Sequence, residues 1–225
     1  MGLGMSALLL IAALTGCGTT QQETASNEIS ASQADSHYPV TVESYNYAGD
    51  VVTTTYEKAP ERVIAVYQGS IETMLALGLE EHVVASYGLD NAVKEEWKDG
   101  LSKMNYHEDV FAPSKEDVMM LEPDMIFSWG SLFGEKKLGD VDQWISRGTN
   151  TYINTNTRAG GYDRTLEHEY TDILNIGKIF DVEEKAQALV DEMKQEIEDA
   201  LAKTKGKEAQ TVSVIEFLND DISNY

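Results

Sequence analysis

The feature that most constrains the fold is a series of four predicted strands, each separated from the next by a segment with helical periodicity. The strands cover residues 62–67, 82–87, 124–129 and 150–154, and 62–67 and 124–129 are largely apolar runs. Uninterrupted apolar runs of this length are typical of strands buried on both faces. Helices are expected between and after them, at 71–77, 93–101, 116–121, 138–146 and 165–180. This alternation predicts an α/β fold in which helices flank a parallel sheet.

Local signals add detail before and after the first run. Residues 40–56 alternate between apolar and polar around Ala48-Gly49-Asp50, which predicts a β-hairpin with a glycine-containing turn. Ser70 is the expected N-cap of the helix at 71–77, and Gly78 is the expected stop signal.

A long helix is predicted at 181–203, with Asp181 as its N-cap and Glu184 at the third helical position. Its apolar stripe consists of Val182, Ala186, Leu189, Val190, Met193, Ile197 and Leu201. At 1.5 Å per residue, about 22 residues extend roughly 33 Å. Gly206 ends the pattern, and residues 211–217 predict one further strand. We therefore expect the chain to end a few residues into a second, incomplete α/β lobe.

The first residues resemble a lipoprotein export signal. The apolar run at 8–14 is too short to span a bilayer, and Leu14-Thr15-Gly16-Cys17 looks like a bacterial lipobox with Cys17 as the lipid-attachment residue. No Lys or Arg precedes Lys58, so we expect the natural start to lie upstream. The expected organisation is signal peptide and lipobox 1–17, flexible tether 18–36, N-terminal lobe 37–180, interlobe helix 181–205 and second-lobe strand 206–225.

The charge balance excludes several classes of partner. With 39 acidic and 17 basic side chains, the formal net charge is −22. Nucleic acid and anionic lipid both require clustered Lys and Arg, so neither is an expected partner, and membrane attachment is expected through the lipid anchor alone. A single cysteine excludes an internal disulfide framework and a cysteine-based zinc site.

Motifs for catalysis are missing from the sequence. It contains no G-x-S-x-G, H-E-x-x-H or P-loop pattern, and its four histidines are dispersed. No catalytic residue, metal site or cofactor is therefore assigned. Two alternatives stay open at this point: a surface hydrolase that uses two of the many carboxylates, and a purely structural surface lipoprotein.

Aromatic and polar side chains follow the ends of the predicted strands. These residues are Tyr67, Gln68, Tyr87, Trp129, Ser131, Asn156 and Arg158. In open parallel sheets ligands bind outside the carboxyl ends of the strands, so one cleft would collect all of them. The alternative for each aromatic residue is that it caps the core with its polar atom in water.

Several stretches, in order and spacing, carry a resemblance to a known family. They are 60–65, Glu72, 75–78, 83–87, 114–116, 121–126 and 176–180. Over residues 59–203 the chain resembles the substrate-binding lipoproteins of iron-complex and vitamin B12 ABC importers. The resemblance implies two α/β lobes joined by a rigid helix, a ligand held between them, no enzymatic activity, and a monomer anchored outside the cell membrane.

The resemblance also implies roles for individual residues. Glu116 corresponds to the family's glutamate that docks on the permease, although an acid stabilising a helix N-terminus is the alternative. Tyr87 and Trp129 correspond to positions that line the cleft, and Phe111 lies near a third. The implied ligand is a ferric siderophore, which Arg158 would pair with; haem or a corrinoid is the alternative ligand.

Overall fold

The computed structural model describes residues 37–208, 210–213, 215–218 and 221–224. Cys17, the signal peptide and the tether lie outside the described residues, so these predictions stay predictions.

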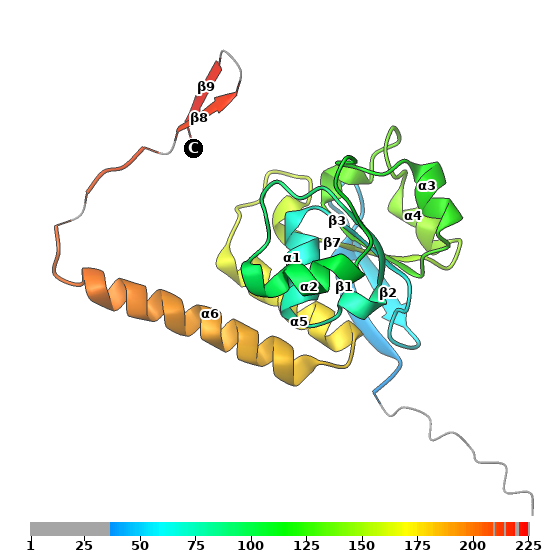
Figure 1. Ribbon diagram of the computed structural model, residues 1–225, viewed down its shortest axis with the longest axis horizontal. Coiled ribbons are helices and arrows are strands. Elements are labelled where there is room, and N and C mark those ends of the chain that lie inside the picture. Colours follow the sequence, from blue (N-terminus) through cyan, green and yellow to red (C-terminus); the bar gives the residue numbers. More distant parts are fainter. Residues whose placement is uncertain (1–36, 209, 214, 219–220, 225) are drawn as a thin grey trace, which may run out of the picture. The chain divides into compact units, whose positions relative to one another are not determined.

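A five-stranded, all-parallel sheet forms the centre of the lobe (Figure 1). Its strands, in spatial order, are β5 (Tyr106–His107), β4 (Val83–Tyr87), β3 (Val63–Val66), β6 (Met125–Ser128) and β7 (Asn150–Ile153). All residues of β3 and β6 are buried, as uninterrupted apolar runs predict. The predicted α/β class is confirmed, and the short edge strand β5 is an addition that the sequence analysis missed.

The two faces of the sheet contact different helices. Val63 and Ala65 point into a core formed with α1 (Gln68–Ala76) and α5 (Leu166–Ile179). Ile64 and Val66 point the other way, into a core formed with α3 (Lys115–Met120) and α4 (Val141–Ile145). The period of two along a strand thus divides the apolar residues into two layers, one on each side of the sheet.

The predicted hairpin is present as β1 (Val40–Tyr45) and β2 (Val51–Tyr56), paired antiparallel with Val40 opposite Tyr56. A hydrogen bond joins the hairpin to the central sheet: the Ile153 amide of β7 donates to Ser44 Oγ of β1 at 2.9 Å. The hairpin therefore lies against the edge formed by β7.

Helix α1 begins earlier than predicted, and Ser70 is not its cap. Tyr67 is the N-cap residue, and Ser70 lies inside the helix, where its buried hydroxyl donates to Asn154 Oδ1 at 2.9 Å. Gly78 ends the helix as expected: it has a φ of +63°, and the Leu79 amide donates back to the Met74 carbonyl at 2.8 Å.

Two further helices are shorter than predicted. The segment at 93–101 is a 3₁₀ turn, η2 (Glu95–Trp97), followed by α2 (Lys98–Lys103), and the segment at 138–146 contains only α4. Three other 3₁₀ turns are η1 (Glu80–His82), η3 (Gly130–Leu132) and η4 (Thr155–Thr157).

The long helix α6 (Glu183–Thr204) follows α5 after a sharp turn. The predicted cap is wrong: Asp181 lies before the helix with a φ of +55°, and Val182 is the N-cap, without a side-chain hydrogen bond. Of the predicted stripe, Ala186 and Val190 are buried, whereas Leu201 is 63% exposed. Only the first half of α6 thus packs on the lobe.

Residues after α6 contain β8 (Ile215–Leu218) and β9 (Asp221–Asn224), which pair antiparallel with Ile215 opposite Asn224. The sequence analysis predicted one strand here, and the structure shows a hairpin. The second strand was missed because Asp221 and Asn224 are polar and interrupt the apolar pattern.

Helices α5 and α6 approach closely at Gly177, so we predict that this glycine is required for stability. A Cβ on Gly177 would overlap the Cβ of Ala186. We expect Gly177→Ala to lower the free energy of unfolding by about 1–3 kcal/mol, although alanine favours helices. Urea unfolding measures this, and adding Ala186→Gly should restore most of the loss.

Gly69 in α1 is the matched control, because a Cβ there would meet only Asn154 Nδ2 at an ordinary 3.7 Å. Gly69→Ala should be neutral or stabilising. Equal stability of Gly177→Ala and the parent protein would refute the close-packing account.

Candidate ligand-binding site

The predicted strand ends meet at one edge of the sheet. Tyr67 follows β3, Tyr87 closes β4, Trp129 follows β6, and Asn156 lies in η4 just after β7. Because these strands are parallel neighbours, their carboxyl ends lie on the same side, where ligands bind in folds of this kind.

Three predicted residues form an aromatic cluster at this edge, which we define as Tyr67, Phe111 and Trp129. The ring centroids of Tyr67 and Trp129 are 3.6 Å apart, and those of Tyr67 and Phe111 are 5.4 Å apart in an edge-to-face arrangement. Phe111 is 54% exposed, so the cluster presents aromatic surface to solvent. Such a surface can bind the apolar parts of a ligand.

Tyr67 has a strained backbone conformation at the centre of this cluster. Its φ of 84° and ψ of 159° lie in a region that favours glycine and costs another residue about 1–3 kcal/mol. The Tyr67 amide donates to the Tyr87 carbonyl at 2.8 Å, and its hydroxyl donates to Asp90. Burial of the ring and the hydrogen bond to Asp90 raise the pKa of Tyr67 to about 12, so the phenol is neutral at physiological pH.

Gln68 supports the site rather than facing it. Its amide nitrogen donates to Glu72 Oε1 at 2.7 Å, and its oxygen accepts from the amides of Asp90 and Asn91 at 3.0 and 3.1 Å. Gln68 thereby holds the loop after β4 against the start of α1. This loop includes Asp90, which accepts the hydrogen bond from the Tyr67 hydroxyl.

Tyr87 is only 4% exposed and stacks on His107, with ring centroids 4.6 Å apart. Burial raises the pKa of Tyr87 above its usual value, and the charge of Asp117 adds to the effect. In this structure Tyr87 lies beneath the surface, so its predicted contact with a ligand is not seen and stays a prediction.

A pocket of about 420 Å³ adjoins the aromatic cluster and includes Trp129 in its wall. Its other lining residues are Gly69, Asn154, Asn156, Thr157, Arg164, Thr165, Leu166 and Glu169. Asn156 shapes one side by donating to the Thr165 carbonyl at 2.9 Å and to Glu169. Its volume is in the range of small-molecule sites.

Arg164 is the pocket residue that the sequence analysis missed. It is exposed, and its guanidinium makes no hydrogen bond or ion pair with the residues that the structure describes. Its position beside Trp129 depends on the path of the loop between η4 and α5, for which the sequence carries no periodic signal.

Arg158 and Ser131 do not line this pocket. Arg158 donates to the Tyr45 hydroxyl at 2.6 Å, and its guanidinium carbon lies 3.6 Å from the centroid of the Tyr162 ring. Ser131 lines a separate hollow of about 680 Å³ together with Tyr47. The structure does not bring all strand-end residues into a single cleft: of the predicted residues only Trp129 and Asn156 line this pocket, and ligand contact by the others stays a prediction.

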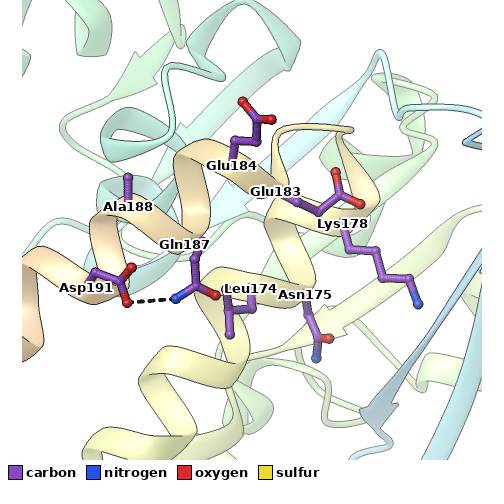
Figure 2. A pocket seen from close by; sticks show the side chains of 8 residues that line it. All are labelled: Leu174, Asn175, Lys178, Glu183, Glu184, Gln187, Ala188 and Asp191. Carbon is purple, nitrogen blue, oxygen red and sulfur yellow. Dashed lines mark hydrogen bonds between the residues drawn. The ribbon is translucent and has the colours of Figure 1, made fainter.

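Another hollow, of about 700 Å³, lies between α5 and α6 (Figure 2). Its lining residues are Leu174, Asn175, Lys178, Glu183, Glu184, Gln187, Ala188 and Asp191. None of the predicted site residues is among them, and it contains no aromatic side chain. We therefore place the candidate ligand site at the pocket beside Trp129.

Glu116 is the second residue of α3 and is exposed. The cap of this helix is formed by others: Ser114 Oγ accepts from the Asp117 amide at 3.1 Å and donates to the Asp117 carboxylate at 2.7 Å. Among the described residues Glu116 has no hydrogen bond or ion pair. Its carboxylate is thus available to a partner, and its docking role stays a prediction.

Comparison with known proteins identifies the class. The family model described as periplasmic binding protein matches residues 63–224, and the chain belongs to this family. The family and its relatives are binding proteins rather than enzymes, so the resemblance drawn from the sequence is confirmed. Within the described residues no helix has the length and apolar character to cross a bilayer.

Two similar proteins match most of this chain. The chain is 28% identical over 205 residues to the uncharacterized ABC transporter substrate-binding lipoprotein YvrC of Bacillus subtilis, covering 90% of this chain and 59% of YvrC. A periplasmic binding protein from Veillonella parvula is 32% identical with a TM-score of 0.75, covering 83% of this chain and 60% of that one.

A third match shows the fold alone. A protein of an ABC-type Fe³⁺-hydroxamate transport system from Saccharomonospora viridis has 23% identity and a TM-score of 0.57, covering 75% of this chain and 57% of that one. The chain therefore spans about 60% of the length of the relatives that it matches.

The carboxyl group of Asp172 holds Thr155, which lies between the pocket residues Asn154 and Asn156, and we predict a pH effect from it. It accepts from the Thr155 amide at 2.8 Å, Thr155 Oγ1 at 2.5 Å and the Tyr152 hydroxyl at 2.9 Å. Burial raises the pKa of Asp172 to about 7, and the hydrogen bonds from Thr155 and Tyr152 oppose that rise only in part.

Between pH 4 and 7 the folded state therefore holds a proton that the unfolded chain, with its ordinary pKa of 3.8, has lost. The contribution of Asp172 to the free energy of unfolding falls as the pH rises through this window. Asp172→Asn should remove that fall, about 1.4 kcal/mol for each pKa unit. Urea unfolding at pH 5 and 8 tests this, with exposed Asp163→Asn as the control; identical profiles for Asp172→Asn and the parent would contradict it.

Proposed function

We propose that this chain is the ligand-capturing part of a substrate-binding lipoprotein of an ABC importer, and that its ligand is a ferric complex, a ferric siderophore in the first place. The observation that carries the proposal is the aromatic cluster at the carboxyl edge of the sheet, adjoining a pocket lined by Arg164, whose guanidinium has no hydrogen bond or ion pair within the described part of the chain. Membership of the periplasmic binding protein family supports capture rather than catalysis.

The chemistry of the pocket favours a ligand with aromatic or apolar surface and negative charge. Trp129, Tyr67 and Phe111 provide ring faces and edges, and Arg164 provides a cation for an anionic group. In a chain of net charge −22, an anion is repelled from most of the surface, so a local guanidinium has a large effect on where it binds.

The identity of one relative supports iron as the cargo. The protein from Saccharomonospora viridis belongs to an Fe³⁺-hydroxamate transport system and shares this fold. Haem or a corrinoid is the alternative ligand, because either would use the same aromatic faces. Delivery to a permease and anchoring outside the membrane through Cys17 are part of the proposal for the complete protein.

Trp129 is expected to contribute strongly to ligand affinity. In the complete protein, isothermal titration with a ferric siderophore should show saturable binding without turnover. Trp129→Ala should weaken it by about 1–3 kcal/mol, because the ligand loses a large aromatic contact. Trp97→Phe is the control, since Trp97 lies in η2 outside the cluster. Unchanged affinity of Trp129→Ala would remove Trp129 from the site, and preferential binding of haem or a corrinoid would select the alternative ligand.

Glu116 has an exposed carboxylate, which is expected to meet an arginine of the permease. Such a charge contributes steering and register more than ligand affinity. In cells that depend on the complete protein, Glu116→Gln and Glu116→Ala should both lower iron uptake several-fold and leave ligand affinity unchanged. Exposed Glu108→Gln is the control for local charge. Normal uptake with both Glu116 variants would show that the carboxylate does not dock.

A further inference from the structure

Three potential metal ligands converge where the turn between α5 and α6 meets the start of the described chain. His37 Nδ1 lies 3.2 Å from Asp181 Oδ1 and 3.5 Å from Glu183 Oε1. The ligand atoms of all three residues lie within 4.8 Å of one another. The imidazole is mostly buried, at 16% exposure, whereas the two carboxylates are about half exposed.

A backbone carbonyl outside this group orients the imidazole. His37 Nε2 lies 2.7 Å from the Lys178 carbonyl, which can only accept, so Nε2 carries a hydrogen. Nδ1 is then the nitrogen that faces the carboxylates. Histidines that bind metals characteristically donate their second ring N–H to a carbonyl or carboxylate in this way.

Three acceptor atoms that face one another require a positive charge between them. The nearby ammonium of Lys178 does not supply it, because Lys178 Nζ donates to the Thr41 carbonyl at 3.0 Å and forms no ion pair with the acids among the described residues. Either a proton on Nδ1, giving an imidazolium ion pair, or a metal ion would supply such a charge.

We propose that His37, Asp181 and Glu183 form a binding site for a divalent transition-metal ion of the zinc type, separate from the ligand pocket. Metal–ligand bonds of about 2.1 Å place ligand atoms about 3.0 Å apart at a right angle and about 3.4 Å apart at the tetrahedral angle. The two distances from Nδ1 match this spacing. One imidazole and two carboxylates suit Zn²⁺, with water completing the coordination.

The position of the site indicates what it does. It joins His37, which lies three residues before β1, to Asp181 in the α5–α6 turn and to Glu183, the first residue of α6. His37 and Asp181 are 144 positions apart in the sequence. A bound ion would therefore fix the α5–α6 turn, in which Asp181 has a φ of +55°, onto the start of the lobe. The inference does not depend on the proposed function.

Zinc binding to the full chain, freed of metal with a chelator, tests the proposal. At pH 8, where protons compete least, isothermal titration with Zn²⁺ should give one saturable site. A hundredfold excess over Kd should raise the Tm by about 5 °C or more. Glu183→Gln and His37→Gln should each weaken binding at least tenfold.

Glu184→Gln is the matched control, because it removes the same charge from the next residue of the same helix. In Figure 2 the carboxylates of Glu183 and Glu184 point in different directions, and Glu184 is not part of the three-residue group. Its variant should bind Zn²⁺ as the parent does. Absorption of bound Co²⁺ gives a second readout that does not depend on Tm.

Two results would overturn the proposal. Weak binding of Zn²⁺ that is equal in the parent, Glu183→Gln and Glu184→Gln would show that the ion associates only with general surface charge. A Tm that responds to pH through His37 but not to Zn²⁺ would show that the group is an imidazolium ion pair.

Discussion

Burial of both faces of the parallel sheet is the constraint on which the rest of the structure depends. Val63 and Ala65 pack against α1 and α5, while Ile64 and Val66 pack against α3 and α4. A sheet covered on both sides leaves only its edges and strand ends accessible, and parallel strands bring their carboxyl ends together. The candidate ligand site therefore lies at this carboxyl edge of the sheet, where residues that follow several strands come together.

The strained backbone of Tyr67 connects this core to the site. Tyr67 is the residue between buried β3 and α1, and its ring contacts Trp129 and Phe111. Two hydrogen bonds hold it in a conformation that an isolated chain would avoid: the Tyr67 amide donates to the Tyr87 carbonyl, and the Tyr67 hydroxyl donates to Asp90. Gln68 and Asp172 accept hydrogen bonds from backbone amides of the loops around the pocket. These bonds fix the geometry of the site before any ligand binds.

The sheet could be predicted from sequence because its signal is local: the apolar composition of segments such as 62–67 and 124–129 is enough to predict buried strands. Two members of the aromatic cluster, Tyr67 and Trp129, could be predicted from the strand ends in the same way, whereas Phe111 was indicated only by the family resemblance. Arg158 and Arg164 show the limit, because a guanidinium reaches far from its backbone and the loop path decides where it points. The sequence predicts Ser70 and Asp181 as helix caps, yet in the structure Ser70 donates to Asn154 and Asp181 contacts His37.

The account's central claim is that a ferric complex binds at the carboxyl edge of the sheet beside Trp129. The most direct measurement is anomalous diffraction at the iron absorption edge from crystals of the complete protein grown with a ferric siderophore. The account predicts an iron peak within about 10 Å of the Trp129 ring, the reach of a siderophore-sized ligand in a pocket of this class. An iron peak elsewhere on the lobe, with the pocket beside Trp129 unoccupied by the complex, would contradict it.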